Sequence, residues 1–264
     1  MTSTAATQDR AATRVSFRGL LASESLKARG LRSSWWLLSV AVLLPIVIAL
    51  ATALTDADTG DGATSSALAA VTGTNYLPHL LLVLLGTLVA TTEYERGAVE
   101  VTFAVVPRRV PVVLAKVVLV AVVALVASLV SSVLGYLTAA AVLGGDSLSG
   151  LGDPGVLRVI VGTAYFQAAS AVIAVAVGLM IRSSIGAVAA TLGFLYAVPA
   201  LLQAIPVAAV TEFARTFPGP ESSILELPGT SGDGSDLAWS VVWVLAWTVV
   251  VVVLGCVVVR RRDV

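Results

Sequence analysis

The chain has 264 residues and a formal net charge of zero, and 58% of its residues are hydrophobic while only 12% are charged. Soluble domains carry about 25% charged residues, so this chain has too few polar side chains to cover a globular surface in water. Its composition and its mean hydropathy of +0.97 exclude an ordinary soluble protein and indicate that lipid is the solvent for much of the chain.

The first 35 residues are polar and basic, unlike the apolar run that follows them. We expect residues 1–13 to be a disordered tail and residues 14–35 to form an amphipathic helix at the cytoplasmic surface of the membrane. Such a helix turns its arginines toward anionic headgroups, and tryptophan marks the interface at its end. The residues that carry this prediction are Glu24, Lys27, Arg29, Arg32 and Trp35. The alternative is a charged flank that only precedes a span.

Glu24 falls within the apolar stripe of the predicted interfacial helix, together with Leu20 and Ala28. A carboxylate in such a place needs a partner. Lys27, three residues further on, is the nearest basic residue along the helix. The spacing therefore indicates Lys27 as the partner of Glu24.

Six apolar runs follow, and all but the second are long enough to cross the hydrocarbon core as a helix. The second run, from about Tyr76 to Thr91, is short and is expected to include residues from 72–75. Strands are excluded because an open strand cannot satisfy its backbone polar groups in lipid. The sequence thus predicts an all-α integral membrane protein with six spans at about 36–54, 74–92, 112–143, 156–181, 185–207 and 239–259. The third run would make a helix of about 48 Å, longer than the core of about 30 Å, so we expect it to tilt or to extend into the cytoplasm near Lys116.

The basic residues are divided unequally between the two sides that six spans define. Fourteen of the sixteen lie on the side that holds both chain ends and the segment between the second and third spans, and only Arg158 and Arg215 lie on the other side. The positive-inside rule places the fourteen in the cytoplasm. Both termini, including a short tail at 260–264, are therefore expected to be cytoplasmic.

The cytoplasmic segment 93–110 is the densest charged patch of the chain. Residues 98–106 suit a short helix between a glycine and a proline, with Val99 and Phe103 on its apolar face. A short apolar helix of this kind fits a groove on a partner protein, although a basic turn that only sets topology would look similar. The docking candidates are Glu93, Gly97, Val99, Phe103, Pro107 and Arg109.

Polar side chains within the spans are candidates for lining a transport pathway: Ser131, Ser132, Tyr136, Gln167, Tyr196 and Gln203. The alternative role for such residues is hydrogen bonding between helices. In the outer segment 208–238, phenylalanines four residues apart suggest a short amphipathic helix at the outer leaflet. His79 is expected at the outer interface, and Cys256 is expected to be a small apolar filler.

The sequence lacks the groups that catalysis or metal binding would need. The only lysines, Lys27 and Lys116, follow Leu26 and Ala115, so neither can be the lysine of a P-loop. One histidine and one cysteine do not make a metal cluster. The spans are nearly free of ionisable side chains, which argues against ion-driven transport and favours an external energy source. We therefore expect no enzyme activity, no catalytic residue and no metal or cofactor bound by this chain.

Three features of the chain are similar to a known family. They are Glu24-Ser25-Leu26-Lys27 followed by Arg32-Ser33 and Trp35-Trp36; Glu93-Tyr94 and Gly97 followed by Pro107, Arg109 and Lys116; and six spans with a long outer loop before the last. In these features the chain resembles the permease subunits of bacterial type-2 ABC exporters. It departs from them at Ala98, where family members commonly have threonine.

The resemblance implies that segment 93–110 holds a coupling helix seated in a cleft of a separate ATPase subunit, which binds ATP and Mg²⁺. By motif position, Glu24, Lys27, Glu93, Gly97, Pro107 and Arg109 would serve coupling. The resemblance also implies an exporter in the bacterial plasma membrane, with two permease chains, identical or similar, surrounded by lipid and without nucleic acid. The alternative function is a membrane scaffold or sensor subunit that does not transport.

Overall fold

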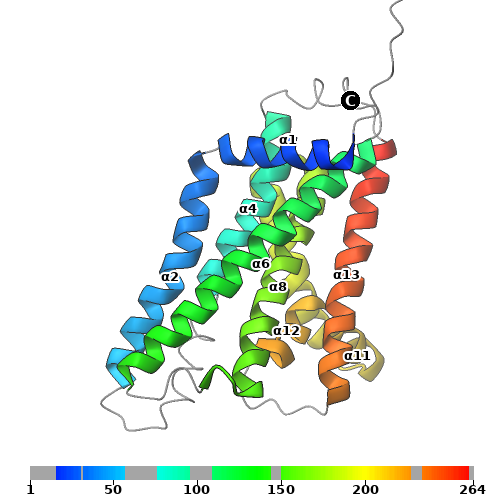
Figure 1. Ribbon diagram of the computed structural model, residues 1–264. Coiled ribbons are helices and arrows are strands. Elements are labelled where there is room, and N and C mark those ends of the chain that lie inside the picture. Colours follow the sequence, from blue (N-terminus) through cyan, green and yellow to red (C-terminus); the bar gives the residue numbers. More distant parts are fainter. Residues whose placement is uncertain are drawn as a thin grey trace, which may run out of the picture.

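The computed structural model describes residues 16–30, 32–56, 76–95, 109–143, 150–226 and 234–261, and over these ranges its regular elements are all helical (Figure 1). The long helices are α1 (Phe17–Gly30), α2 (Arg32–Asp56), α4 (Tyr76–Glu95), α6 (Arg109–Val142), α8 (Pro154–Ile181) and α13 (Gly234–Arg261). Shorter elements follow α8: α9 (Ser184–Leu192), the π-helical turn η1 (Gly193–Ala197), α10 (Val198–Gln203), α11 (Ala208–Arg215) and α12 (Pro218–Glu226).

Five helical segments in the described ranges are long and apolar enough to cross a membrane: α2, α6, α8, α13 and the continuous run Ser184–Gln203. The second predicted span, 74–92, corresponds to α4, a helix of 20 residues whose apolar part, Tyr76–Thr92, is shorter than the others. It runs among the longer helices (Figure 1). The structure therefore confirms a multi-helix membrane architecture, and the assignment of α4 as a further span stays a prediction.

Helix α8 forms the centre of the molecule. Of its most apolar window, 83% is buried, whereas the corresponding value is 22–28% for the other four candidate spans. Glycines on α8 and α4 allow the backbones of the two helices to come close together. A Cβ added to Gly178 would lie 2.9 Å from the Ala90 Cβ, and one added to Gly86 would collide with the Ala171 carbonyl. Helices α4 and α8 therefore pack with their backbones close together.

Helix α1 lies across the ends of the longer helices (Figure 1). The sequence predicted one interfacial helix over residues 14–35, but α1 ends at Gly30 and α2 begins at Arg32. Glycine is a poor helix former, which favours the end of α1 at this position. As a consequence, Arg32 and Trp35 belong to the first turns of α2. The location of α1 at a membrane surface remains a prediction.

The fifth predicted span, 185–207, ends earlier and is less regular than expected. Its last helix, α10, stops at Gln203, before Pro206, which cannot continue a helix. Within the run, the backbone N–H of Val198 donates to the Gly193 carbonyl, a five-residue π-type spacing. Pro199 follows at once and has no N–H with which to make the usual bond to Leu195. The π turn is thus the local response to this proline.

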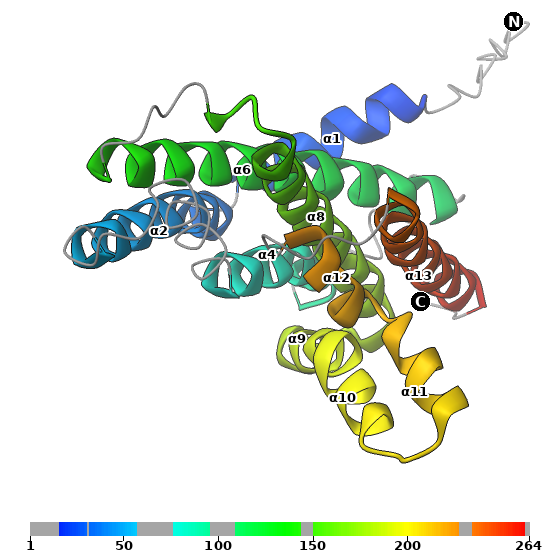
Figure 2. The same ribbon diagram turned by 90° about the horizontal axis from the view of Figure 1, so that it is seen from below.

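The outer segment holds two short helices, α11 and α12, where the sequence predicted one amphipathic helix. They are fixed by aromatic packing: the Phe217 ring lies 4.6 Å from the Trp247 ring and 5.4 Å from the Phe194 ring, measured between centroids. Glycines allow α12 to approach its neighbours, since a Cβ on Gly162 of α8 would meet the Leu225 carbonyl oxygen at 2.5 Å. Seen from below, α12 lies against α8 and not away from the bundle (Figure 2).

Candidate functional site

The predicted coupling segment is bounded by the end of α4 and the start of α6. Glu93 lies in the last turn of α4, and Arg109 is the first residue of α6. Gly97, Val99, Phe103 and Pro107 lie outside the described residues, so their proposed roles stay predictions. The described part of the site consists of the two flanks of this segment.

The first flank is an ion cluster between α1 and α6. Lys116 Nζ donates to Glu24 Oε2 at 2.6 Å, and Lys27 Nζ donates to Glu24 Oε1 at 2.8 Å. The side chains of Glu24 and Lys116 are 3% and 4% exposed, whereas that of Lys27 is 41% exposed. The two lysines of the whole chain therefore meet at one carboxylate, one of them buried with it and the other at its edge.

Apolar packing surrounds the ion cluster. Leu20 of α1 forms a buried group with Val112 and Ala115 of α6. These contacts fall within the first two turns of α6, directly after the predicted coupling segment. A buried ion pair that loses one partner is destabilised by about 3–5 kcal/mol, because the remaining charge stays out of water. Helix α1 is therefore held firmly to the start of α6.

The second flank joins the end of α4 to the turn between α8 and α9. The hydroxyls of Thr91 and Ser184 are 2.6 Å apart, and the Arg182 guanidinium carbon lies 4.9 Å from the centre of the Tyr94 ring. Arg182 has a φ of 62° and ends α8, while Ser183 caps α9 by accepting from the Gly186 N–H. Sequence analysis did not single out Arg182 or Thr91. The sequence signal that could have indicated this contact was Tyr94, which follows Glu93 in the family motif.

A pocket of about 600 Å³ lies between α4 and the run Ser184–Gln203, away from α1. Its lining includes Tyr76, His79, Ala189, Gly193 and Tyr196. His79 was expected at the outer interface. It is instead 5% exposed, because α4 places its ring 4.9 Å from Phe166 and 5.8 Å from Tyr196. Its Nε2 has no hydrogen-bond partner among the described residues.

The predicted pathway residues separate into two groups. Tyr196 lines the pocket and is 38% exposed, and Gln203 is exposed at the end of α10. Ser131, Ser132, Tyr136 and Gln167 are buried and do not belong to that lining. Tyr136, for example, packs with alanines of α2 and valines of α8. Sequence analysis did not single out Thr163 of α8, whose buried hydroxyl has no partner among the described residues.

Within the described ranges, no group of three or more potential metal-ligating side chains comes together. The arrangement can hold helices together at both flanks of the predicted coupling segment. The ion cluster of Glu24, Lys27 and Lys116 lies at one end of the bundle. The 600 Å³ pocket lies further along α4, and the buried helix α8 packs between the other long helices.

A comparison with protein families adds an independent finding. The family model described as "ABC-2 family transporter protein" matches residues 20–200. The match covers more than half of the chain and runs from α1 into α10, so it includes both flanks and the pocket. A comparison with curated proteins finds none that matches.

Proposed function

Because the chain belongs to the ABC-2 family of transporter proteins, as the match over residues 20–200 establishes, we propose that it is the permease of an ABC exporter in a bacterial plasma membrane. A separate ATPase subunit binds ATP and Mg²⁺ and supplies the energy. The multi-pass chain itself provides the passage. Its apolar helices and its family membership support this assignment.

The proposed orientation places α1 and both chain ends in the cytoplasm, with α4 as a sixth span. The support comes from the basic residues, fourteen of which fall on one side in that arrangement. Helix α1, the start of α6 and the end of α13, which carry several of these basic residues, lie at the same end of the molecule (Figure 1). The coupling segment 93–110 would then face the ATPase.

The observation that carries the coupling proposal is the buried contact between Lys116 and Glu24. An ATPase that moves segment 93–110 displaces the start of α6, and the ion cluster passes this movement to α1. On the other flank, movement of the end of α4 displaces Ser184 and Arg182 through their contacts with Thr91 and Tyr94. Both helices that border the 600 Å³ pocket are thereby connected to the docking segment.

The passage is proposed to form where two permease chains meet along α4 and Ser184–Gln203. The open pocket at this edge supports the proposal, because its lining includes Tyr76 and Tyr196, whose exposed rings would face the second chain or the substrate. Tyr196, at its rim, is then a pathway residue. Gln203 lies further along the same run.

Coexpression with a candidate P-loop ATPase from the same genome tests the proposal. We expect the two to copurify, and we expect Phe103→Asp to abolish both copurification and stimulation of ATP hydrolysis. The matched control is Phe213→Asp, which changes a 52% exposed phenyl ring at the other end of the molecule. Undiminished copurification and stimulation with Phe103→Asp would overturn the docking proposal. Copurification without transport would favour the scaffold or sensor function.

A further inference from the structure

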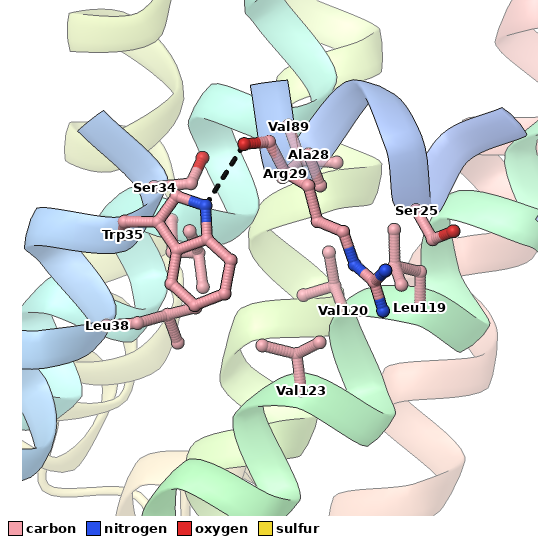
Figure 3. Close-up of a pocket in the computed structure, with 11 residues that line it drawn as sticks. Ser25, Ala28, Arg29, Ser34, Trp35, Leu38, Val89, Leu119, Val120 and Val123 are labelled. Atoms are coloured by element: carbon pink, nitrogen blue, oxygen red, sulfur yellow. Dashed lines mark hydrogen bonds between the residues drawn. The ribbon is translucent and has the colours of Figure 1, made fainter. Parts of the chain in front are cut away.

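A second cavity, of about 250 Å³, lies beneath α1 and is separate from the pocket beside Tyr196. Four helices contribute to it: α1 forms the roof, α2 and α6 form the sides, and α4 forms the back wall with Leu85 and Val89 (Figure 3). In Figure 1, α2 and α6 run from the end of the molecule where α1 lies and converge toward the opposite end. We refer to this partly open cavity as the notch.

The rim of this notch is cationic. Arg29 lines it from α1, and in Figure 3 its guanidinium points down from the roof toward Val120 and Leu119. No carboxylate among the described residues pairs with this guanidinium, although Glu24, one turn away, binds both lysines. The notch thus presents a positive charge directly above an apolar surface.

Two side chains from the start of α2 complete the rim. The Trp35 Nε1 donates to the Arg29 carbonyl at 3.0 Å, which joins α2 to α1 across the notch (Figure 3). Ser34 is 5% exposed, and its hydroxyl has no partner among the described residues. This hydroxyl is shielded from solvent, so Ser34 contributes to the wall of the notch and not to the binding of a head group.

The interior below the rim is apolar. Leu38 of α2 and Val120 and Val123 of α6 line it together with the back wall from α4. A ligand that fits must therefore carry an anionic head at the level of Arg29 and a hydrocarbon chain below it. Trp35 stands at the boundary between these two parts, as tryptophan does at membrane interfaces.

We propose that this notch binds one anionic glycerophospholipid, with its phosphate at Arg29 and an acyl chain against Val120 and Val123. The chemistry favours this occupant because the notch combines a cation that pairs with no carboxylate of the described residues with an apolar trough on a membrane protein. A zwitterionic lipid would bring its ammonium group toward the guanidinium. The bound lipid packs against α1, α2, α4 and α6 and stabilises their arrangement. This role does not depend on the identity of the exported substrate.

Native mass spectrometry of the full-length protein, released from nanodiscs of phosphatidylglycerol and phosphatidylcholine, tests the proposal. We expect one phosphatidylglycerol to be retained per chain in preference to phosphatidylcholine. Arg29→Gln should reduce this retention about tenfold, the effect of losing one charge-assisted contact. The matched control is Arg18→Gln, which removes an exposed arginine of α1 that does not line the notch.

A second variant separates chain binding from head binding. Val123→Phe fills the trough while leaving Arg29 in place, and it should reduce retention of phosphatidylglycerol as well. Inorganic phosphate at millimolar concentration should not displace the lipid, because it lacks the chain. Equal retention of both lipids, unchanged retention with Arg29→Gln, or displacement by phosphate alone would each overturn the proposal.

Discussion

At the scale of single residues, Glu24 shows how burial determines the contribution of an ion pair to the free energy of unfolding. Its two carboxylate oxygens accept from two lysines at nearly equal distances, 2.6 Å from Lys116 and 2.8 Å from Lys27. Lys27 is 41% exposed, so water competes for its charge, whereas Lys116 is 4% exposed. Surface pairs contribute about 0–1 kcal/mol, but a buried pair that loses one partner costs about 3–5 kcal/mol.

We therefore predict that Lys116→Met lowers the free energy of unfolding by about 3 kcal/mol, while Lys27→Met lowers it by at most about 1 kcal/mol. Thermal unfolding of the purified protein in lipid nanodiscs measures both. The double variant Glu24→Leu with Lys116→Met should regain most of the loss, because both buried charges are removed together. Equal effects of the two lysine substitutions would contradict the assignment of Lys116 as the buried partner.

The sequence predicted only the local half of this cluster. Lys27 lies one helical turn from Glu24, so periodicity was enough to indicate it. Lys116 is 92 positions from Glu24 and belongs to another helix, so its contact depends on how α1 crosses α6. The burial of His79 was not predictable for the same reason, because its neighbours Phe166 and Tyr196 come from distant segments of the sequence. The sequence around His79 indicated only a location near the outer interface.

At the scale of elements, the helices follow the apolar runs, while their irregular parts follow individual prolines and glycines. Predicted and observed bounds agree within a few residues for α4, α6, α8 and α13. The fifth run differs because Pro199 converts a turn to π geometry. The course of α12 was not visible in the sequence, because it depends on Gly162 and Gly219, which only become contact points once distant helices are in place.

We predict that Gly162→Ala destabilises the protein by about 1–3 kcal/mol, because the added methyl group meets the Leu225 carbonyl at 2.5 Å and must displace α12. Gly193→Ala is the matched control, since a Cβ there has no atom within 4 Å outside its own helix. That substitution should be neutral or slightly stabilising. Thermal unfolding, followed by Trp247 fluorescence as a probe of the neighbouring aromatic cluster, distinguishes them. Equal destabilisation by both would show that α12 does not depend on this contact.

At the scale of the whole molecule, the two flanks of segment 93–110 lead to different parts of the bundle. One flank connects α6 with α1, and the other connects α4 with α9. Between them stands α8, whose burial leaves little room for independent movement. A displacement at the docking segment is therefore expected to appear at the edges of the molecule, in α1 and in Ser184–Gln203, and not at its centre.

The edge formed by α4 and Ser184–Gln203 gives the last prediction. If two permease chains meet there with twofold symmetry, a residue near the axis faces its own copy. In a Cys256→Ala background, which has no other cysteine, we expect at least one of Tyr76→Cys, Tyr196→Cys and Leu201→Cys to form an intermolecular disulfide on mild oxidation. The control is Val250→Cys, which is 47% exposed and belongs to α13, a helix that contributes no residue to the lining of the pocket.

The oxidation is carried out on membranes, before the protein is extracted from lipid. The measurement is the fraction of dimer on non-reducing gels. A disulfide requires Cα atoms within about 7 Å, so random collisions of chains in the bilayer give little product. Cross-linking should respond to the ATPase partner, because movement at segment 93–110 reaches this edge through Thr91 and Ser184. Cross-linking at position 250 with none at the other three would place the interface at α13 and would leave the pocket beside His79 facing lipid.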